Sequence, residues 1–419
     1  MYINNIPIYR IYVLIILLLN INPLNAKTIN VCSNCKIQTI EKAVQVASNG
    51  DTIIVKEGTY FEKDIEIRKS LTILGENAII DAENKGGVFH IYADNTTIKG
   101  FTINNIKKSY TKDIAAIYTF GIKNFIFENN TFNNPFFALL IQRSSHGLIA
   151  NNKIFGNAIN EVSSANGIHL WHSSNVIIHN NIIDKMRDGI YLEFVKNSKI
   201  HHNISSNQQR YGLHFMFSNN NEYTHNVFEK NAAGVAVMFS KYISMNHNQF
   251  KDNWGTASFG LLLKEIYDAD IGNNIFEKNT IGINVEGSSR VQYENNIFKN
   301  NGWALKITGG CYKNIFIQND FINNSFDLSY NGRINENKFH SNYWSEYNGY
   351  DLDKDGIGDI SYQPVKLFSY ITQQTPESII LLRSLFIDLV NFSEKVSPLF
   401  ISEKIKDHSP QIKMVNIAS

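Results

Sequence analysis

Short segments with alternating apolar and polar positions recur along the middle of the chain. Six of them begin with glycine, and the first and third residues after each of these glycines are apolar. A strand with one buried face shows this pattern, because successive side chains point to opposite faces. We therefore expect twelve side chains to point inward, namely Ile168, Leu170, Ile190, Leu192, Leu213, Phe215, Val235, Val237, Leu261, Leu263, Ile283 and Val285.

A second repeat, Asn-Asn-x-Phe/Ile with variations, recurs at the same intervals as the first. The steps between its aligned asparagines run from 18 to 29 residues and are most often 22 or 23, which predicts the coils of a right-handed parallel β-helix. Asn tolerates the left-handed backbone angles of a tight corner, and stacked side-chain amides can form a hydrogen-bonded ladder. The aligned residues are Asn130, Asn152, Asn181, Asn203, Asn226, Asn248, Asn274, Asn296, Asn319 and Asn337.

The open N-terminal end of such a solenoid needs a cover over its apolar interior. Apolar residues at helical spacing from Ile40 to Ala47 predict a short capping helix, and "SLTILG" and "TTIKGFTI" follow as the first strands. A leucine-rich repeat has a similar period, but its closely spaced leucines are missing here. We therefore predict an all-β fold, a right-handed parallel β-helix of about 22–23 residues per coil.

The C-terminal tail has a different, helical pattern. Thr375 suits an N-cap and Pro376 the first helical position, so a strongly apolar helix is predicted over Pro376–Val390, with Arg383 and Asp388 along it. Such a helix must bury its apolar side, either on the last coil or on a membrane partner, and "SEKVSPLFISEKI" could share these uses. The predicted segments are an export signal (1–26), a cap with a cysteine pair (27–60), the β-helix (61–340), an Asp-rich loop (341–365) and the helical tail (366–419).

The charge balance and the N-terminal sequence indicate which partners and which compartment to expect for this protein. Lys and Arg number 39 against 38 Asp and Glu, so the chain lacks the basic excess that nucleic-acid binding needs. Arg10 precedes an apolar run from Ile11 to Leu19, and cleavage after Ala26 fits a secretory signal, with an uncleaved anchor as the alternative. We expect the mature chain outside the cytoplasm.

Three cysteines are present. Cys32 and Cys35 form a Cys-Ser-Asn-Cys pair just after the predicted cleavage site. In an oxidising compartment this pair predicts a local disulfide, and the alternatives are a redox role or a Cu⁺ site made by thiolates. Cys311 has no partner in the sequence pattern and is expected to be a small buried apolar residue.

The outward positions of the glycine-phased strands show no pair of carboxylates suited to glycoside hydrolysis. They do bring together soft ligands, because Met216 and Met238 fall in one column on adjacent coils, about 4.8 Å apart, with His214 two residues from Met216. Thioether and imidazole groups suit copper, particularly Cu⁺. The alternative is an apolar surface for protein contact, where Met and aromatic residues are also favoured.

Five further histidines stand immediately before the corner asparagines of successive coils, or one position earlier. Packing and hydrogen bonding at the corner explain them more simply than metal binding, although a second ladder of metal ligands is the alternative. These residues are His179, His201, His202, His225 and His247.

The segment from Asn342 to Pro364, "NYWSEYNGYDLDKDGIGDISYQP", is rich in aspartate and glycine. Its four aspartates, Asp351, Asp353, Asp355 and Asp359, fall at positions 1, 3, 5 and 9 of a calcium-type loop, with Gly356 at position 6. Carboxylate oxygens favour Ca²⁺ over copper. Position 12 is a tyrosine instead of the usual glutamate, so a turn locked by hydrogen bonds is the alternative.

Three stretches together carry a resemblance to a known family. They are the "IEKAVQVASNGDTIIVKEGTY" entrance, the Asn-Asn-x-Phe coils and the "NYWSEYNGYDLDKDGIGDISYQP" segment, and the tail "TPESIILLRSLFIDLVNFSEKVSPLF" extends the match. On these residues the chain resembles the NosD family of periplasmic maturation factors of nitrous oxide reductase. The wider group of similar β-helix proteins includes members described as carbohydrate-binding or sugar-hydrolase-like.

The resemblance implies a non-enzymatic accessory protein in the periplasm. It would work with an ABC-type ATPase and permease to build the copper centres of nitrous oxide reductase, with a copper chaperone as a further partner. Copper would then be a transient cargo. Calcium, which the spacing of the aspartates in the loop predicts, would be structural. A protein that binds or cleaves polysaccharide is the competing interpretation.

Overall fold

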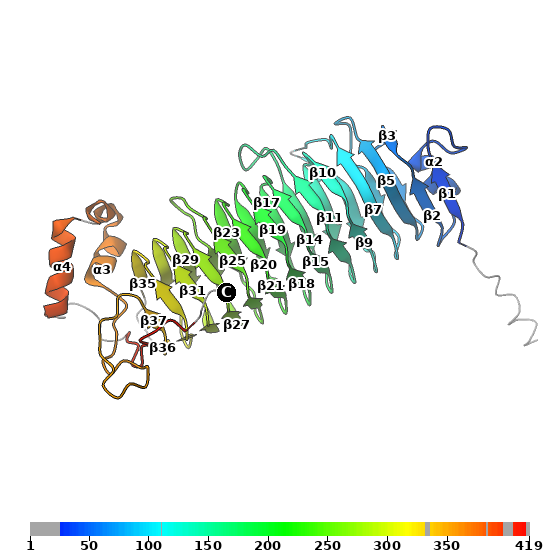
Figure 1. Ribbon diagram of the computed structural model, residues 1–419. Coiled ribbons are helices and arrows are strands. Elements are labelled where there is room, and N and C mark those ends of the chain that lie inside the picture. Colours follow the sequence, from blue (N-terminus) through cyan, green and yellow to red (C-terminus); the bar gives the residue numbers. More distant parts are fainter. Residues whose placement is uncertain (1–25, 110, 332–335, 383, 397–404, 416–419) are drawn as a thin grey trace, which may run out of the picture.

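The computed structural model describes residues 26–109, 111–331, 336–382, 384–396 and 405–415. These residues form a parallel β-helix, elongated along its axis, with α2 at one end and α3 and α4 at the other (Figure 1). A typical coil contributes one strand to each of three faces, as β17, β18 and β19 do. The predicted fold class is therefore confirmed.

One face is a separate 12-stranded sheet. Its strands are β4 (Ile65–Ile67), β6 (Phe89–Ile91), β8 (Ala115–Phe120), β11 (Phe137–Gln142), β14 (Asn166–Trp171), β17 (Asp188–Glu193), β20 (Tyr211–Met216), β23 (Ala233–Met238), β26 (Leu261–Lys264), β29 (Ile281–Glu286), β32 (Trp303–Thr308) and β35 (Phe326–Asn331).

The other two faces join into a 25-stranded sheet through the long strands β5 and β7. The first of these faces contains β1 (Thr28–Val31), β2 (Thr52–Val55), β5 (Thr72–Asp81), β7 (Thr97–Asn104), β9 (Ile126–Glu128), β12 (Leu148–Ala150), β15 (Ile177–His179), β18 (Lys199–His201), β21 (Glu222–Thr224), β24 (Ser244–Asn246), β27 (Tyr267–Gly272), β30 (Ser289–Glu294), β33 (Ile315–Ile317) and β36 (Lys338–His340). The second adds β3 (Gly58–Tyr60), β10 (Thr131–Asn133), β13 (Lys153–Phe155), β16 (Ile182–Asp184), β19 (Ile204–Ser206), β22 (Val227–Glu229), β25 (Gln249–Lys251), β28 (Ile275–Glu277), β31 (Ile297–Lys299), β34 (Asp320–Ile322) and β37 (Tyr343–Trp344).

The core lies inside the coils and follows the glycine-phased pattern. All twelve side chains predicted to point inward are fully buried. Aromatic rings also stack from coil to coil in the interior, as in the run from Phe250 through Phe276 to Phe298, whose neighbouring centroids are 4.5 and 5.0 Å apart. Equivalent positions therefore repeat their contacts along the axis, as expected of a solenoid.

The asparagine ladder is present and completely buried along its length. Each side-chain oxygen accepts hydrogen bonds of 2.8–3.2 Å from the backbone and side-chain N–H groups of the asparagine on the preceding coil, from Asn130 to Asn342. The assignment of Asn337 to this ladder was wrong, because Asn342 accepts the bonds from Asn319. Asn337 belongs to another corner, where its side-chain oxygen accepts a hydrogen bond from the Asn314 N–H. The left-handed backbone was also assigned one residue late, since the residue before each ladder asparagine adopts it.

A second ladder, which the sequence interpretation missed, lies at the corner after the third strand of each coil. Asn253, Asn279, Asn301 and Asn324 are linked from coil to coil by side-chain amide bonds of 2.9–3.1 Å. Two corners of the solenoid are thus held in register by the same chemistry.

The N-terminal end is covered by α2 (Ile40–Val46), where the sequence predicts a helix. Thr39 caps it by accepting a 3.3 Å hydrogen bond from the Lys42 N–H, and Ile40, Ala43 and Val44 are buried in the main core. The solenoid hydrogen bonding already begins at β1, since Thr28 pairs in parallel with Thr52.

The C-terminal end carries α3 (Leu367–Gln374), the 3₁₀ helix η1 (Pro376–Leu381) and α4 (Leu385–Val396). The single helix predicted over Pro376–Val390 is therefore wrong: Thr375 makes no side-chain cap bond, and the segment divides into a 3₁₀ and an α-helix. Phe368 and Ile387 bury against Phe326 of the last coil. No helix among the described residues is long and apolar enough to cross a membrane.

Some predicted features fall outside the described residues. They are the export signal apart from Ala26, Arg383, and most of "SEKVSPLFISEKI".

The segment Ile405–Val415 returns to the last coils and continues the first asparagine ladder. The Asp407 Oδ2 atom accepts hydrogen bonds from the backbone and side-chain N–H groups of Asn342 at 3.1 and 3.0 Å, and from the Trp344 indole at 3.1 Å. The Asp407 backbone also bridges to Phe339 and Tyr362. A carboxylate at this point satisfies donors that would otherwise be buried without partners.

Asp327 on β35 gives the C-terminal end a predicted pH dependence. Burial raises the pKa of Asp327 to about 7, and Lys366 and the Asn324 amide offset this only in part. Because the unfolded pKa is about 3.9, the folded state binds the proton more tightly, and stability from this group falls as pH rises from about 4 to 7. We expect Asp327→Asn to remove this slope and to stabilise the protein by up to about 4 kcal/mol above pH 7. Unfolding free energies measured between pH 4 and 8 check this, and an unchanged slope in the variant would contradict it.

Candidate functional site

The outer face of the 12-stranded sheet brings together the three soft residues predicted from the sequence. Met216 on β20 pairs with Met238 on β23, and His214 lies two residues before Met216 on the same strand. Their neighbours Leu213 and Phe215 belong to the inner core, whereas Met238 packs in a separate outer cluster. His214, Met216 and Met238 therefore share the outward face, and we call them the soft patch.

His214 is more buried than an outward position suggests, with 6% of its surface exposed. Its ring lies 4.9 Å from those of both Tyr191 and Tyr211, and Tyr211 in turn packs against Phe259 from the loop before β26. Both ring nitrogens lack a hydrogen-bond partner among the described residues. Burial lowers the pKa of His214 to about 4, so the imidazole is neutral at physiological pH and keeps a lone pair for a metal ion.

An ion-pair cluster lies beside the soft patch on the same face. The fully buried Asp188 on β17 accepts a 2.9 Å hydrogen bond from Arg210 Nε and a second from Arg210 Nη2, and Arg187 Nε lies 3.5 Å from Asp188 Oδ2. Burial, followed by the charge of Glu193, raises the pKa of Tyr191 to about 12 and keeps its hydroxyl protonated. Sequence reasoning missed this cluster, although Arg187 and Arg210 stand 23 residues apart, one coil period, at equivalent positions of adjacent coils.

A stack of exposed aromatic rings borders the soft patch. Phe194, Phe217 and Phe239, which we call the phenylalanine ladder, follow the ends of β17, β20 and β23 with ring centroids 5.1 and 5.2 Å apart. All three adopt left-handed backbone angles and are 36–42% exposed. Bulky residues are uncommon in this conformation and cost about 1–3 kcal/mol there, so the exposed rings are held in a conformation that the fold must stabilise.

The five corner histidines form a stacked array on another face. His179 stacks on His201 at 5.0 Å, and His202, His225 and His247 stack in turn at 4.8 and 4.9 Å. The two stacks meet where His201 Nδ1 lies 3.0 Å from His202 Nδ1. His202, His225 and His247 lie at the expected corner, whereas His179 and His201 end β15 and β18. The imidazoles contact one another along four coils.

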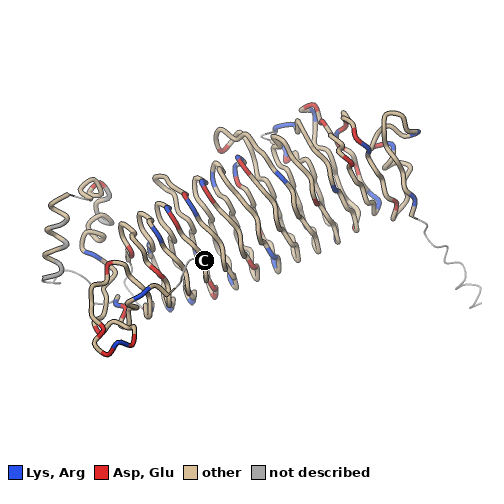
Figure 2. The backbone as a smooth tube through the Cα atoms, in the orientation of Figure 1, with Lys and Arg blue, Asp and Glu red and all other residues tan. Residues whose placement is uncertain are grey.

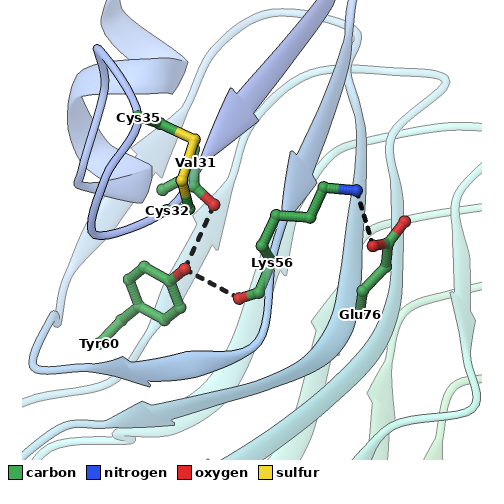
Figure 3. Close-up of a disulfide and its surroundings, with 6 residues drawn as sticks. All are labelled: Val31, Cys32, Cys35, Lys56, Tyr60 and Glu76. Atoms are coloured by element: carbon green, nitrogen blue, oxygen red, sulfur yellow. Dashed lines mark hydrogen bonds and ion pairs between the residues drawn. A yellow bond between two sulfur atoms is a disulfide. The ribbon is translucent and has the colours of Figure 1, made fainter.

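The cysteine pair has formed a disulfide. The Cys32 and Cys35 sulfurs are bonded at 2.08 Å, close to the Tyr60 hydroxyl, which lies 3.2 Å from the Val31 carbonyl oxygen and 2.8 Å from that of Lys56 (Figure 3). The alternative of a thiolate copper site is wrong for this state, because neither sulfur is free. Cys311 is buried, as the sequence predicts.

The Asp-rich loop gathers three of its four aspartates. One carboxylate oxygen each from Asp351, Asp353 and Asp355 lies within 4.8 Å of the others, and the loop stands out as an acidic tip in Figure 2. The Asp355 N–H bond lowers the pKa of Asp353, but the neighbouring Asp355 charge and other effects raise it overall. Asp359 instead accepts a 2.8 Å bond from the Leu352 N–H.

Hydrogen bonds also lock this loop as a turn. Asp351 Oδ2 accepts a 2.9 Å bond from the Gly356 N–H, and Asp351 Oδ1 accepts one of 3.2 Å from the Asp355 N–H. The C-terminal segment holds the loop from outside, through a 2.7 Å bond from the Gly358 N–H to the Pro410 carbonyl oxygen. The hydrogen-bonded turn is therefore present, and the calcium site remains a prediction.

Calcium binding by this loop has a direct test. We expect Asp353→Ala combined with Asp355→Ala to lower thermal stability in calcium and to leave it almost unchanged in chelator. A ligand at a hundred times its Kd stabilises the folded state by about 2.7 kcal/mol, and the variant would lose this term. Equal losses in both conditions, measured by thermal unfolding, would instead favour the turn alone.

Comparison of the sequence and the fold with known proteins shows which proteins this chain is similar to. A family profile described as periplasmic copper-binding protein (NosD) matches residues 155–349. A probable ABC transporter binding protein NosD from Stutzerimonas stutzeri is 26% identical over 375 residues, covering 80% of this chain and 81% of the relative. By these comparisons the chain is similar to NosD proteins, and its fold is a parallel β-helix. The soft patch, the phenylalanine ladder and the histidine array all lie within the matched residues.

A second relative aligns over a shorter region. The protein of the same description from Pseudomonas aeruginosa is 29% identical over 114 residues, which cover 26% of this chain and 27% of that relative.

Solved structures agree on the fold of this chain. A periplasmic alginate epimerase AlgG double mutant aligns with a TM-score of 0.54 at 12% identity, covering 76% of this chain and 84% of that one. The Yersinia enterocolitica family 28 exopolygalacturonase gives 0.51 at 11% identity, with 75% and 78% covered. The Streptococcus pneumoniae adhesin PfbA gives 0.52 at 16% identity, with 72% and 95% covered. At these identities the likeness concerns the fold alone.

Proposed function

We propose that this chain is an exported accessory protein that works with an ABC transporter to assemble or deliver the copper centres of nitrous oxide reductase, and that copper passes through the soft patch as Cu⁺. One observation carries the copper step: His214 is buried beside Met216 and Met238, and neither of its ring nitrogens has a partner in the part of the chain that the structure describes. A buried polar group without a hydrogen bond is costly, so its retention points to a ligand.

The residues of the soft patch suit Cu⁺ as a transient cargo. Methionine thioethers are soft ligands that select Cu⁺, and neutral imidazole is a common copper ligand. Because the pKa of His214 is about 4, the ring stays neutral across the physiological range and needs no proton release before binding. Both methionines are only half-buried, which leaves a route for copper to enter and leave.

The names of the relatives support the transporter as a partner, since both are described as probable ABC transporter binding proteins. The tail offers a surface for such a contact, because Ile380, Leu385 and Phe392 of η1 and α4 are 86%, 75% and 65% exposed. Several large apolar side chains exposed in one short segment are typical of a docking surface. A copper chaperone in the periplasm would supply Cu⁺ to the soft patch.

Protein docking is the alternative role of the soft patch itself. The phenylalanine ladder continues the patch with exposed aromatic rings, and aromatic and methionine side chains are enriched at protein interfaces. In that case the reductase or the transporter would bind this face, and copper would be held elsewhere.

Polysaccharide binding or cleavage is the competing function. The outer face does carry polar groups, but Asp188 is fully buried and contacts two guanidinium groups, so it is not free to act as one of the two carboxylates that glycoside hydrolysis uses. The fold shared with polysaccharide-active enzymes adds nothing about this site.

Deletion of this protein in its host tests the proposed function. We expect nitrous oxide reductase to be exported but to lack part of its copper, measured as metal content per reductase. The purified protein should leave uronic-acid polymers intact. Normal copper loading of the reductase in the deletion strain, or cleavage of a saccharide that depends on a carboxylate of this chain, would overturn the proposal.

A further inference from the structure

The stacked corner histidines, His179, His201, His202, His225 and His247, form a surface array that the soft patch does not use. They account for five of the 12 histidines in the chain. His202, His225 and His247 are exposed, and His179 and His201 are half-buried. The array lies at β15, β18 and the corners that follow β18, β21 and β24, whereas the soft patch lies on the 12-stranded sheet.

The fold does not require histidine at these corners. Asn180 and Asn273 occupy the same corner position on neighbouring coils, with the same left-handed angles as His202 and His225. The backbone bond is the same as well, since the Asn180 N–H donates to the His201 carbonyl oxygen and the His202 N–H to that of Thr224. The imidazole rings therefore add side-chain chemistry that backbone geometry does not demand.

One pair in the array has the spacing of two ligands to a single ion. His201 Nδ1 and His202 Nδ1 share a hydrogen bond of 3.0 Å, and their rings are nearly perpendicular at 87°. A metal ion bound by both nitrogens would take the place of the shared proton. With metal–nitrogen bonds of about 2.05 Å, two nitrogens at this separation subtend an angle of about 94° at the metal. This is close to the square angle that Cu²⁺ prefers with nitrogen ligands and narrower than the tetrahedral angle of Zn²⁺.

We propose that His201 and His202 bind one Cu²⁺ ion through their Nδ1 atoms, with His179 and His225 as the nearest further imidazoles on the adjoining coils. Imidazole nitrogens suit Cu²⁺, whereas the thioethers of the soft patch suit Cu⁺, so the two places differ in the oxidation state that they hold. The proposal stands on the histidine geometry and does not depend on the function proposed above.

The test uses the full chain prepared without a histidine tag and titrated with Cu²⁺. We expect one equivalent to bind with nitrogen superhyperfine splitting in the electron paramagnetic resonance spectrum. His201→Thr combined with His202→Asn should lose this equivalent. Both replacements are residues that the fold already uses at these positions, Thr224 next to His201 in the sheet and Asn180 at the equivalent corner, so the backbone should be preserved.

His146→Asn is the matched control. His146 is exposed and has a left-handed angle like His202, but lies outside the array, and Asn175 occupies the equivalent corner on the next coil. This variant should keep the bound Cu²⁺. Retention of the signal in the double variant, absence of Cu²⁺ binding by the native chain, or displacement of Cu²⁺ by an equal concentration of Zn²⁺ would each overturn the proposal. If the double variant fails to fold, His201→Thr alone must weaken Cu²⁺ binding at least tenfold.

Discussion

Replacing His214, Met216 and Met238 together with alanine is expected to abolish Cu⁺ retention while leaving the β-helix folded. The expected loss is complete, because the variant removes the imidazole and both thioethers from the proposed site at once. Competition with a chromogenic Cu⁺ chelator measures the retention, and the copper content of the reductase in cells measures the consequence.

The fold should survive this change for structural reasons. The three side chains lie outside the coils, and the inner neighbours Leu213 and Phe215 keep their core contacts. Removing His214 orphans no hydrogen-bond partner, because its ring nitrogens make no hydrogen bond among the described residues. The remaining cost is lost packing on the outer face, which for buried side chains is about 2–5 kcal/mol each and less where they are half exposed.

Lys264→Ala provides the matched control, because Lys264 pairs with Met238 on the next coil and shares its outward column. It should retain Cu⁺ as the native chain does. If the triple variant keeps copper but no longer captures the reductase or the transporter, the soft patch is a docking surface and the copper step of the proposal is wrong.

The sequence predicted the coils because their pattern is local and repeated. In a strand with one buried face, apolar residues alternate with polar ones, so the pattern is visible in the sequence. Counting from the glycines placed Ile168 and Val285, many coils apart, on the same inner face. The asparagine motif set the corner in the same way. Its alignment failed at Asn337, where two corners carry similar motifs and the shorter spacing of 18 residues pointed to the wrong one. It also assigned the left-handed backbone one residue late.

The C-terminal end could not be predicted, because it depends on contacts between residues far apart in the chain. Asp407 reaches Asn342 over 65 residues, and no local pattern connects a lone aspartate to the end of an amide ladder. The apolar run after Pro376 predicted one helix with a buried side. In the structure Ile387 is buried against the last coil, but Ile380 and Leu385 remain exposed.

The candidate site was predicted in part. Alternation alone was enough to place His214 and Met238 on one face, and this is what the strand pairing shows. Alternation could not predict the burial of His214. This burial depends on Tyr191 from the preceding coil, on Tyr211 from its own coil and on Phe259 from an inserted loop. Burial is nevertheless what lowers the pKa of the ring, whose nitrogens have no partner among the described residues.

Asn226→Ala is expected to be among the most destabilising single changes in the chain. The Asn226 Oδ1 atom accepts bonds of 3.0 Å from the backbone and side-chain N–H groups of Asn203. Its Nδ2 atom donates to the Ile200 carbonyl oxygen at 2.8 Å and to Asn248 Oδ1 at 3.0 Å. Alanine removes all four bonds and leaves their partners inside the protein, where each unsatisfied group costs about 1–3 kcal/mol.

We therefore expect the free energy of unfolding to fall by at least about 3 kcal/mol, measured by chemical denaturation. His225→Asn is the control from the adjacent position, where the side chain is exposed and asparagine is the residue found on other coils, and it should change stability by less than about 0.5 kcal/mol. Because each coil of a solenoid contacts only its neighbours, the loss should be concentrated in the coils around β21 and β22, which hydrogen exchange can resolve. A loss below about 1 kcal/mol would mean that the ladder sets register without contributing much stability.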